Sequence, residues 1–248
     1  MHMKKHYLFL ALYMFVMGLG LIVTKHVFNT SYESEHFGQT FLPFMTILAV
    51  MSVIYGLRNK STLALAPTKK HGWLFILPFI TITLLWILTM VDNANAGLMF
   101  ILAMIDAILI GIAEEVAFRG IILGGLAQRI KPLYAVLLSA ILFAALHLLN
   151  VLGGVTLSDV LNQMLSTFLM GIFLGAVYIY TRNIFYPIFF HFAWDYVFLN
   201  NGLGAVSFAP MLFIGTVVLE VLVIVWILWK MRHVQTLEPK SDVTAIKQ

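Results

Sequence analysis

The chain has 248 residues, of which 61% are hydrophobic and only 10% are charged. Soluble domains average roughly 45–50% apolar and about 25% charged residues, so a water-soluble globule and a disordered chain are both excluded. The net charge of +4 comes from basic residues that are not gathered into one run, which argues against a nucleic-acid partner. Cysteine is absent, which excludes disulfides, thiolate metal ligands and a cysteine nucleophile.

Apolar runs long enough to cross a membrane, about 20 residues each, recur along the chain. They lie at 7–24, 40–57, 73–91, 97–118, 133–151, 160–181, 184–200 and 208–229. The first run follows Lys4 and Lys5 and lacks a small-residue cleavage site, so we expect a retained anchor. The sequence therefore predicts an all-α polytopic membrane protein with about eight transmembrane helices. We expect one helical-bundle domain over 1–230 and a short polar cytoplasmic tail over 231–248.

The distribution of basic residues predicts the orientation of these spans. If the N-terminus is cytoplasmic, all of the 15 Lys and Arg residues except Lys25 fall on or near the cytoplasmic side. Acidic residues gather on the other side, namely Glu33, Glu35, Asp92 and Asp159. The positive-inside rule then favours an even number of spans with both termini in the cytoplasm.

Inserting an ionisable side chain into the membrane costs roughly 2.5–3.5 kcal/mol on insertion scales. Each such residue inside a span is therefore expected to have a structural or functional role. The acidic ones are Asp106, Glu114, Glu115, Asp195 and Glu220. Glu115 and Arg119 are four residues apart and can pair on one helical face. Glu114 is turned about 100° away from Glu115. An ion pair that only locks the helix explains Glu115 and Arg119, but it leaves Glu114 as an unpaired acid suited to general-base chemistry.

Histidines occur in two further spans. His147 follows Phe143 by one helical turn, and His191 and Asp195 are four residues apart, so this carboxylate can accept a proton from the imidazole. Taken alone, His147 could be a satisfied core residue and His191–Asp195 a helix-stabilising pair. The combination predicts a site that activates water, either on a divalent metal or directly by base catalysis.

Three motifs carry a resemblance to a known family. Glu114-Glu115-Val116-Ala117-Phe118-Arg119 reads as Glu-Glu-x-x-x-Arg, and Phe143 to His147 reads as Phe-x-x-x-His. His191 to Asp195 reads as His-x-x-x-Asp. In this order they resemble the CAAX-processing and bacteriocin-processing (CPBP) family of intramembrane proteases, also called the Abi or type II CAAX prenyl endopeptidase family. The resemblance covers about 97–200, the expected catalytic core.

The resemblance implies a role for each motif residue. Glu114 would activate the attacking water, and His147 and His191 would stabilise the oxyanion or bind a metal. Asp195 would assist His191, while Glu115 and Arg119 would support the site. The third motif ends in Asp where the eukaryotic CAAX enzymes have Asn, which favours metal or proton handling and weakens transfer of their prenyl-CAAX specificity. Zinc bound by His147, His191 and Asp195 is thus one alternative, and a metal-free site is the other.

The depths of the two histidines predict an offset between their helices. By rise per residue, His147 lies about 20 Å from the cytoplasmic end of its helix and His191 about 10 Å along its own. We therefore expect the helices to begin at different depths or to tilt unequally, with a water-filled cavity reaching the site.

Two function classes remain open from the sequence. The first is a CAAX-protease-like intramembrane (metallo)endopeptidase in a bacterial plasma membrane, which hydrolyses a membrane-associated peptide or small membrane protein near the cytoplasmic side. The alternative is a non-catalytic membrane protein for bacteriocin immunity or a signalling scaffold. A proton-relay transporter ranks last, because neither inverted repeats nor broken helices are visible.

Overall fold

The computed structural model describes residues 2–66 and 75–239, and within these ranges the chain is helical, without a strand. The long helices are α1 (His2–His26), α2 (Phe37–Arg58), α4 (Ile76–Asp92), α5 (Leu98–Glu115), α7 (Pro132–Leu146), α8 (Leu157–Thr181), α9 (Phe185–Leu199) and α10 (Ala209–Met231). The shorter elements are helices α3 (Lys60–Leu63) and α6 (Gly124–Ala127), 3₁₀ segments η1 (Ala94–Ala96), η3 (His147–Gly153) and η4 (Gly202–Gly204), and the π-helical segment η2 (Val116–Leu123). The predicted all-α fold is confirmed.

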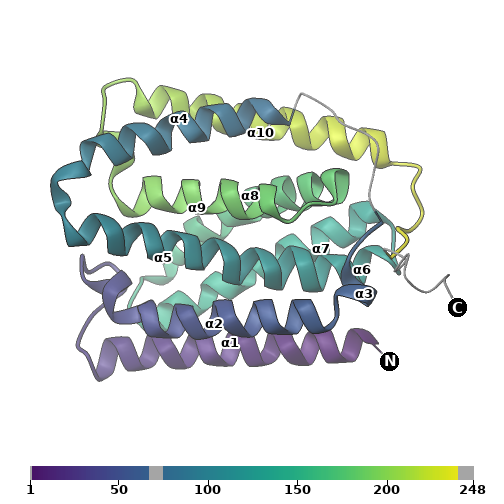
Figure 1. Ribbon diagram of the computed structural model, residues 1–248, viewed down its shortest axis with the longest axis horizontal. Coiled ribbons are helices and arrows are strands. Elements are labelled where there is room, and N and C mark those ends of the chain that lie inside the picture. The colour runs from purple at the N-terminus through teal and green to yellow at the C-terminus, as the bar shows by residue number, and fades with distance from the viewer. Residues whose placement is uncertain (1, 67–74, 240–248) are drawn as a thin grey trace, which may run out of the picture.

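The long helices lie side by side in one bundle. Figure 1 shows α1 and α2 along one side, α4 and α10 along the opposite side, and α5, α7, α8 and α9 between them. The packing agrees with this view, because α2 packs on α5, α5 on α9, α9 on α4, and α7 on α8. The helices that carry the predicted site residues, α5, α7 and α9, are therefore interior ones.

Several of the described helices can cross a membrane by length and composition. Five qualify, namely α1, α2, α8, α10 and the continuous helix formed by α7 and η3. The helix α4 is apolar, but its 17 residues are fewer than the about 20 that a crossing needs, and α9 has 15. The helix α5 carries Asp106, Glu114 and Glu115, which lower its hydropathy. The chain is a multi-pass membrane protein, and the number of eight crossings stays a prediction.

Large apolar side chains remain exposed along the outside of the bundle. Leu8, Leu165 and Met211 are 72%, 72% and 74% exposed. Extended apolar surface of this kind is rare on soluble monomers, whereas lipid tails can cover it in a bilayer. The outer surface therefore agrees with a membrane location.

Both ends of the described chain lie at the same end of the bundle. Pro239 forms an isolated β-bridge with Leu65, which follows α3. A Cβ added at Gly125 of α6 would lie 2.9 Å from the sulfur of Met3, near the start of α1. A chain that starts and finishes at one end of a bundle makes an even number of crossings, as the charge distribution predicts. Residues 240–248 of the expected tail lie outside the described residues.

Close helix contacts at glycines bring the interior helices together. A Cβ added at Gly111 of α5 would lie 3.0 Å from the carbonyl oxygen of Ile188 and 3.2 Å from Cβ of Phe192, both in α9. A Cβ added at Gly171 of α8 would lie 3.0 Å from Cβ of Ala140 in α7. Small residues at such points let helix backbones approach closely in membranes. The α5–α9 contact is the one that positions the site.

Candidate active site

The two glutamates are the last residues of α5, directly before the π-helical segment η2. Arg119, in that segment, donates from Nη1 to Oε1 of Glu115 at 2.7 Å. This is the pair that the four-residue spacing predicts. Segments of π-helix occur mostly as single turns at functional sites. Here the change of register begins at the residue after Glu115, between the two members of the pair.

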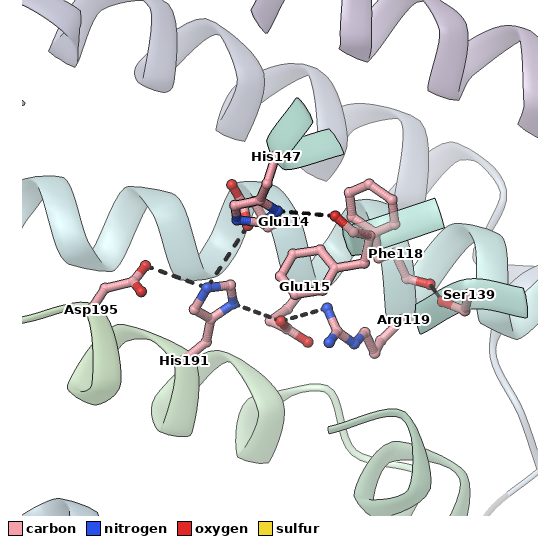
Figure 2. Close-up of polar contacts among 9 residues, drawn as sticks. Glu114, Glu115, Phe118, Arg119, Ser139, His147, His191 and Asp195 are labelled. Atoms are coloured by element: carbon pink, nitrogen blue, oxygen red, sulfur yellow. Dashed lines mark hydrogen bonds and ion pairs between the residues drawn. The ribbon is translucent and has the colours of Figure 1, made fainter. Parts of the chain in front are cut away.

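His191 is the central residue of the site, as Figure 2 shows. Its Nδ1 lies 2.6 Å from Oε1 of Glu115. Its Nε2 lies 3.3 Å from Oδ2 of Asp195 and 3.8 Å from Oε2 of Glu114. Ionised carboxylates only accept hydrogen bonds, so a proton on each ring nitrogen lets His191 donate on both sides. The imidazole therefore lies within a group of three carboxylates.

His147 lies where α7 ends and the 3₁₀ segment η3 begins. Its Nδ1 lies 3.0 Å from the carbonyl oxygen of Phe143, an oxygen that can only accept. Nδ1 therefore carries the proton, and in the neutral ring Nε2 is left as an acceptor. This hydrogen bond fixes the tautomer and orientation of the ring, a role that backbone carbonyls often have for functional histidines.

One aromatic ring joins the two histidines. The ring centroid of Phe143 lies 5.1 Å from that of His147 and 5.7 Å from that of His191, edge to face in both cases. The guanidinium carbon of Arg119 lies 4.4 Å from the centre of the same ring. Such cation–π contact adds a second interaction that holds Arg119 in place. Phe143 thus aligns residues from three helical segments.

The shared contact with Phe143 settles the depths of the histidines. His147 comes after the 15 residues of α7, about four turns, whereas His191 lies in the second turn of α9. Since both rings touch Phe143, α9 begins deeper in the bundle than α7. The predicted offset between the two helices is therefore present.

The site is closed at one side and partly open at the other. The side chains of Glu115, Arg119 and His191 are fully buried, at 0%, 1% and 2% exposed. The side chain of Asp195 is 20% exposed, and His147 is also partly exposed. Glu114 is buried, and its Oε2 has no hydrogen-bond partner in the described part of the chain. The exposed part of the site is therefore the part formed by Asp195 and His147.

One contact of the site was not predicted. The spacing of His191 and Asp195 pointed to that pair, whereas the shortest contact of His191 is to Glu115, 76 positions away. Spacing within one helix reveals only neighbours on that helix. The sequence feature that indicates a close approach of another helix is Gly111, a small residue one turn before Glu115.

The fit of a metal ion can be judged from the donor atoms. Within residues 2–66 and 75–239, no group of three or more His, Cys, Asp or Glu side chains is arranged to hold one. Of the residues expected to bind zinc, His191 has its Nδ1 bonded to Glu115, and the Nδ1 of His147 donates to Phe143. Metal-binding imidazoles must offer an unprotonated nitrogen. For both histidines the hydrogen bond at Nδ1 leaves Nε2 as the nitrogen that could meet this requirement, and such a bond is common in metal-binding histidines, so zinc binding by these residues stays a prediction.

Comparison with known protein families finds a match within the chain. Residues 96–197 match the family model described as type II CAAX prenyl endopeptidase Rce1-like. The matched segment includes α5, α7 and α9 and all three motifs, from Glu114 to Asp195. No curated protein matches the chain.

Proposed function

Residues 96–197 of this membrane protein form a domain of the type II CAAX prenyl endopeptidase (Rce1-like) family, consistent with the CPBP group, and from this premise we propose an intramembrane endopeptidase that uses Glu114 to activate water. The observation that carries the proposal is the carboxylate of Glu114, buried 3.8 Å from Nε2 of His191, whose Oε2 has no hydrogen-bond partner in the described part of the chain. A buried acceptor without a partner is costly in a purely structural role. A water molecule is the partner that general-base catalysis requires.

The reaction begins with the attack of this water on the scissile carbonyl carbon. Glu114 accepts one proton from the water as the new C–O bond forms, and the carbonyl oxygen takes the negative charge. The Nε2 of His147, an acceptor, is suited to hold the second proton of the water. The protonated Glu114 then donates to the leaving nitrogen as the C–N bond breaks, which returns the carboxylate to its starting state.

His191 is suited to stabilise the oxyanion. Its Nε2 faces the side of the site that contains Asp195 and Glu114, so an N–H at this position can donate to the developing charge. Asp195 orients the ring and balances its charge from that side. On the other side Glu115 holds Nδ1, and Arg119 holds Glu115. These residues keep the donor in place before the reaction begins.

We propose a metal-free route, because no group of three or more His, Asp or Glu side chains in the described residues is arranged to hold an ion. The expected result is that treatment with a chelator leaves the rate of peptide cleavage by the purified protein unchanged. Metal analysis is expected to find far less than one ion per chain. Loss of activity on chelation, with recovery on adding zinc, would instead support metal binding by His147, His191 and Asp195.

The proposed substrate is a membrane-associated peptide or small membrane protein, and the proposed location is a bacterial plasma membrane. The family match supports a peptide substrate, and the exposed apolar helices support a bilayer. The Asp at position 195 distinguishes the third motif from that of the eukaryotic enzymes, so we do not assign prenylated CAAX proteins as substrates.

The experiment compares peptide termini in the membrane fraction of cells that express wild type or Glu114→Gln at matched abundance. Glu220→Gln serves as a control, because Glu220 is also a buried acid but lies in α10. We expect new termini with wild type and with Glu220→Gln that are absent with Glu114→Gln. Identical termini in all three, with the cellular phenotype retained by Glu114→Gln, would favour a non-catalytic immunity or scaffold role.

A further inference from the structure

Tyr13, in α1, presents a buried hydroxyl that the mechanism above does not use. Its side chain is 0% exposed, and its Oη has no hydrogen-bond partner in the described part of the chain. Buried tyrosine hydroxyls usually find a partner, because leaving one without any forfeits its hydration. Tyr13 also lies outside the segment that matches the family model, so no family motif covers it.

Tyr13 lies in the aromatic cluster that surrounds the active site. Its ring packs edge-on against Phe118 at 6.2 Å between centroids. Phe118 packs in turn on Phe143 at 5.2 Å, and Phe143 contacts both histidines. Phe118 comes four residues after Glu114, and residues at this spacing share one side of a helix. The ring of Tyr13 therefore packs on the side of the helix that carries Glu114.

The register of α1 places Tyr13 at the depth of the catalytic residues. Gly18, further along α1, lies against Leu149 and Leu152 of η3, which follow His147. Near the other end of α1, Met3 lies against Gly125 in α6, which follows η2. Tyr13, between these two contacts, is thus level with the segment that separates Glu114 from α6.

Like the hydroxyl of Tyr13, the Oε2 of Glu114 is buried and has no hydrogen-bond partner in the described part of the chain, although it lies 3.8 Å from Nε2 of His191. Within the described residues, the buried polar atoms of this region without a hydrogen-bond partner thus include the Tyr13 hydroxyl and Nη2 of Arg119 as donors, and one oxygen each of Glu114 and Glu115 as acceptors. Oxyanions in acyl-transfer enzymes are commonly held by more than one donor, and the mechanism above provides only His191.

We propose that the Tyr13 hydroxyl is a second hydrogen-bond donor to the oxyanion that forms when water activated by Glu114 attacks the peptide carbonyl. The hydroxyl donates its hydrogen bond to the carbonyl oxygen and keeps its proton throughout, so the proton balance of the reaction is unchanged. This inference rests on the proposed function. It extends the active site to α1, outside the family domain.

A structural role for the hydroxyl predicts a different result from a catalytic one. Since Oη has no partner, Tyr13→Phe removes an unsatisfied group and keeps the ring, which leaves stability equal or higher. A donor to the oxyanion forms its hydrogen bond only in the transition state. Its loss therefore lowers kcat and leaves KM nearly unchanged. A drop in kcat without a drop in stability is therefore the signature of the proposed role.

The test uses the full chain in nanodiscs and a synthetic peptide that spans a cleavage site dependent on Glu114. Tyr196→Phe is the matched control, because Tyr196 is also 0% exposed with an unpartnered hydroxyl, but it packs on Phe100 in the first turn of α5. We expect Tyr13→Phe to lower kcat by about 100-fold or more, the usual effect of removing one oxyanion donor. Its thermal midpoint should equal or exceed that of wild type, and Tyr196→Phe should retain wild-type kcat.

Wild-type kcat for Tyr13→Phe, or an equal loss in Tyr196→Phe, would overturn the role of Tyr13. In either case, loss of cleavage by Glu114→Gln would leave the proposed function standing. If no cleavage depends on Glu114, the proposed function fails, and the role of Tyr13 fails with it. A lower thermal midpoint for Tyr13→Phe that accounts for its lower rate would show a structural role instead.

Discussion

His191 has a carboxylate near each of its ring nitrogens, and this arrangement controls its protonation and direction. Glu115 lies 2.6 Å from Nδ1, and Asp195 lies 3.3 Å from Nε2. Arg119 donates to the same Oε1 of Glu115 that contacts His191. One carboxylate oxygen thus connects a fixed cation to the imidazole of His191, so the support for the candidate site is electrostatic as well as steric.

This connection predicts a large loss of stability in Glu115→Gln. The change leaves the buried guanidinium of Arg119 without its counter-charge, and breaking a buried ion pair from one side costs about 3–5 kcal/mol. We expect the midpoint of denaturant unfolding in detergent to fall accordingly. The double variant Glu115→Gln with Arg119→Met should recover part of the loss, because neither charge remains. Equal destabilisation in the single and double variants would contradict this view.

Pairs within one helix were predictable from the sequence, and contacts between helices were not. The four-residue spacing of Glu115 and Arg119 led to the observed ion pair, and the spacing of His191 and Asp195 led to the observed contact. The Glu115–His191 contact depends on how α5 packs against α9. The approach of Tyr13 to Phe118 depends likewise on α1. No local pattern encodes either distance.

Two interruptions of α-helical geometry lie next to residues of the candidate site. The π-helical segment η2 starts after Glu115, and the 3₁₀ segment η3 starts at His147. The sequence predicted continuous helices over 97–118 and 133–151, because an apolar run reports length and burial but not hydrogen-bond register. The hydrogen-bond register of the helix therefore changes between Glu115 and Arg119, and again at His147.

The α5–α9 contact at Gly111 provides a test at the level of the helix. A valine there would meet the carbonyl oxygen of Ile188, so Gly111→Val should push α9 away and lengthen the Glu115–His191 contact. We expect loss of most cleavage activity and a lower thermal midpoint. Gly215→Val is the control, because a Cβ at Gly215 in α10 has no atom within 4 Å. Equal activity in the two variants would show that the contact does not position the site.

For the whole molecule, the prediction concerns its direction in the membrane. Both ends of the described chain lie at one end of the bundle, which agrees with the predicted even number of crossings (Figure 1). By the positive-inside rule, the charge distribution predicts that this end lies in the cytoplasm. The loop between α1 and α2 would then lie outside, and the α2–α3 connection inside.

Cysteine labelling tests this orientation cleanly, because the chain has no cysteine of its own. Ser31 and Ser61 are both exposed and lie at opposite ends of α2. We expect a membrane-impermeant maleimide to label Ser31→Cys in intact cells and Ser61→Cys only after permeabilisation. The reverse pattern would place the termini outside and contradict the predicted topology.

The central claim is that Glu114 activates the water that cleaves the peptide. The most direct measurement is the turnover of a synthetic peptide, spanning a cleavage site found in cells, by purified wild type and Glu114→Gln in nanodiscs. Loss of a general base should lower kcat by about 10²–10⁴-fold, with the thermal midpoint and the KM nearly unchanged. Cleavage by Glu114→Gln at the wild-type rate would contradict the account.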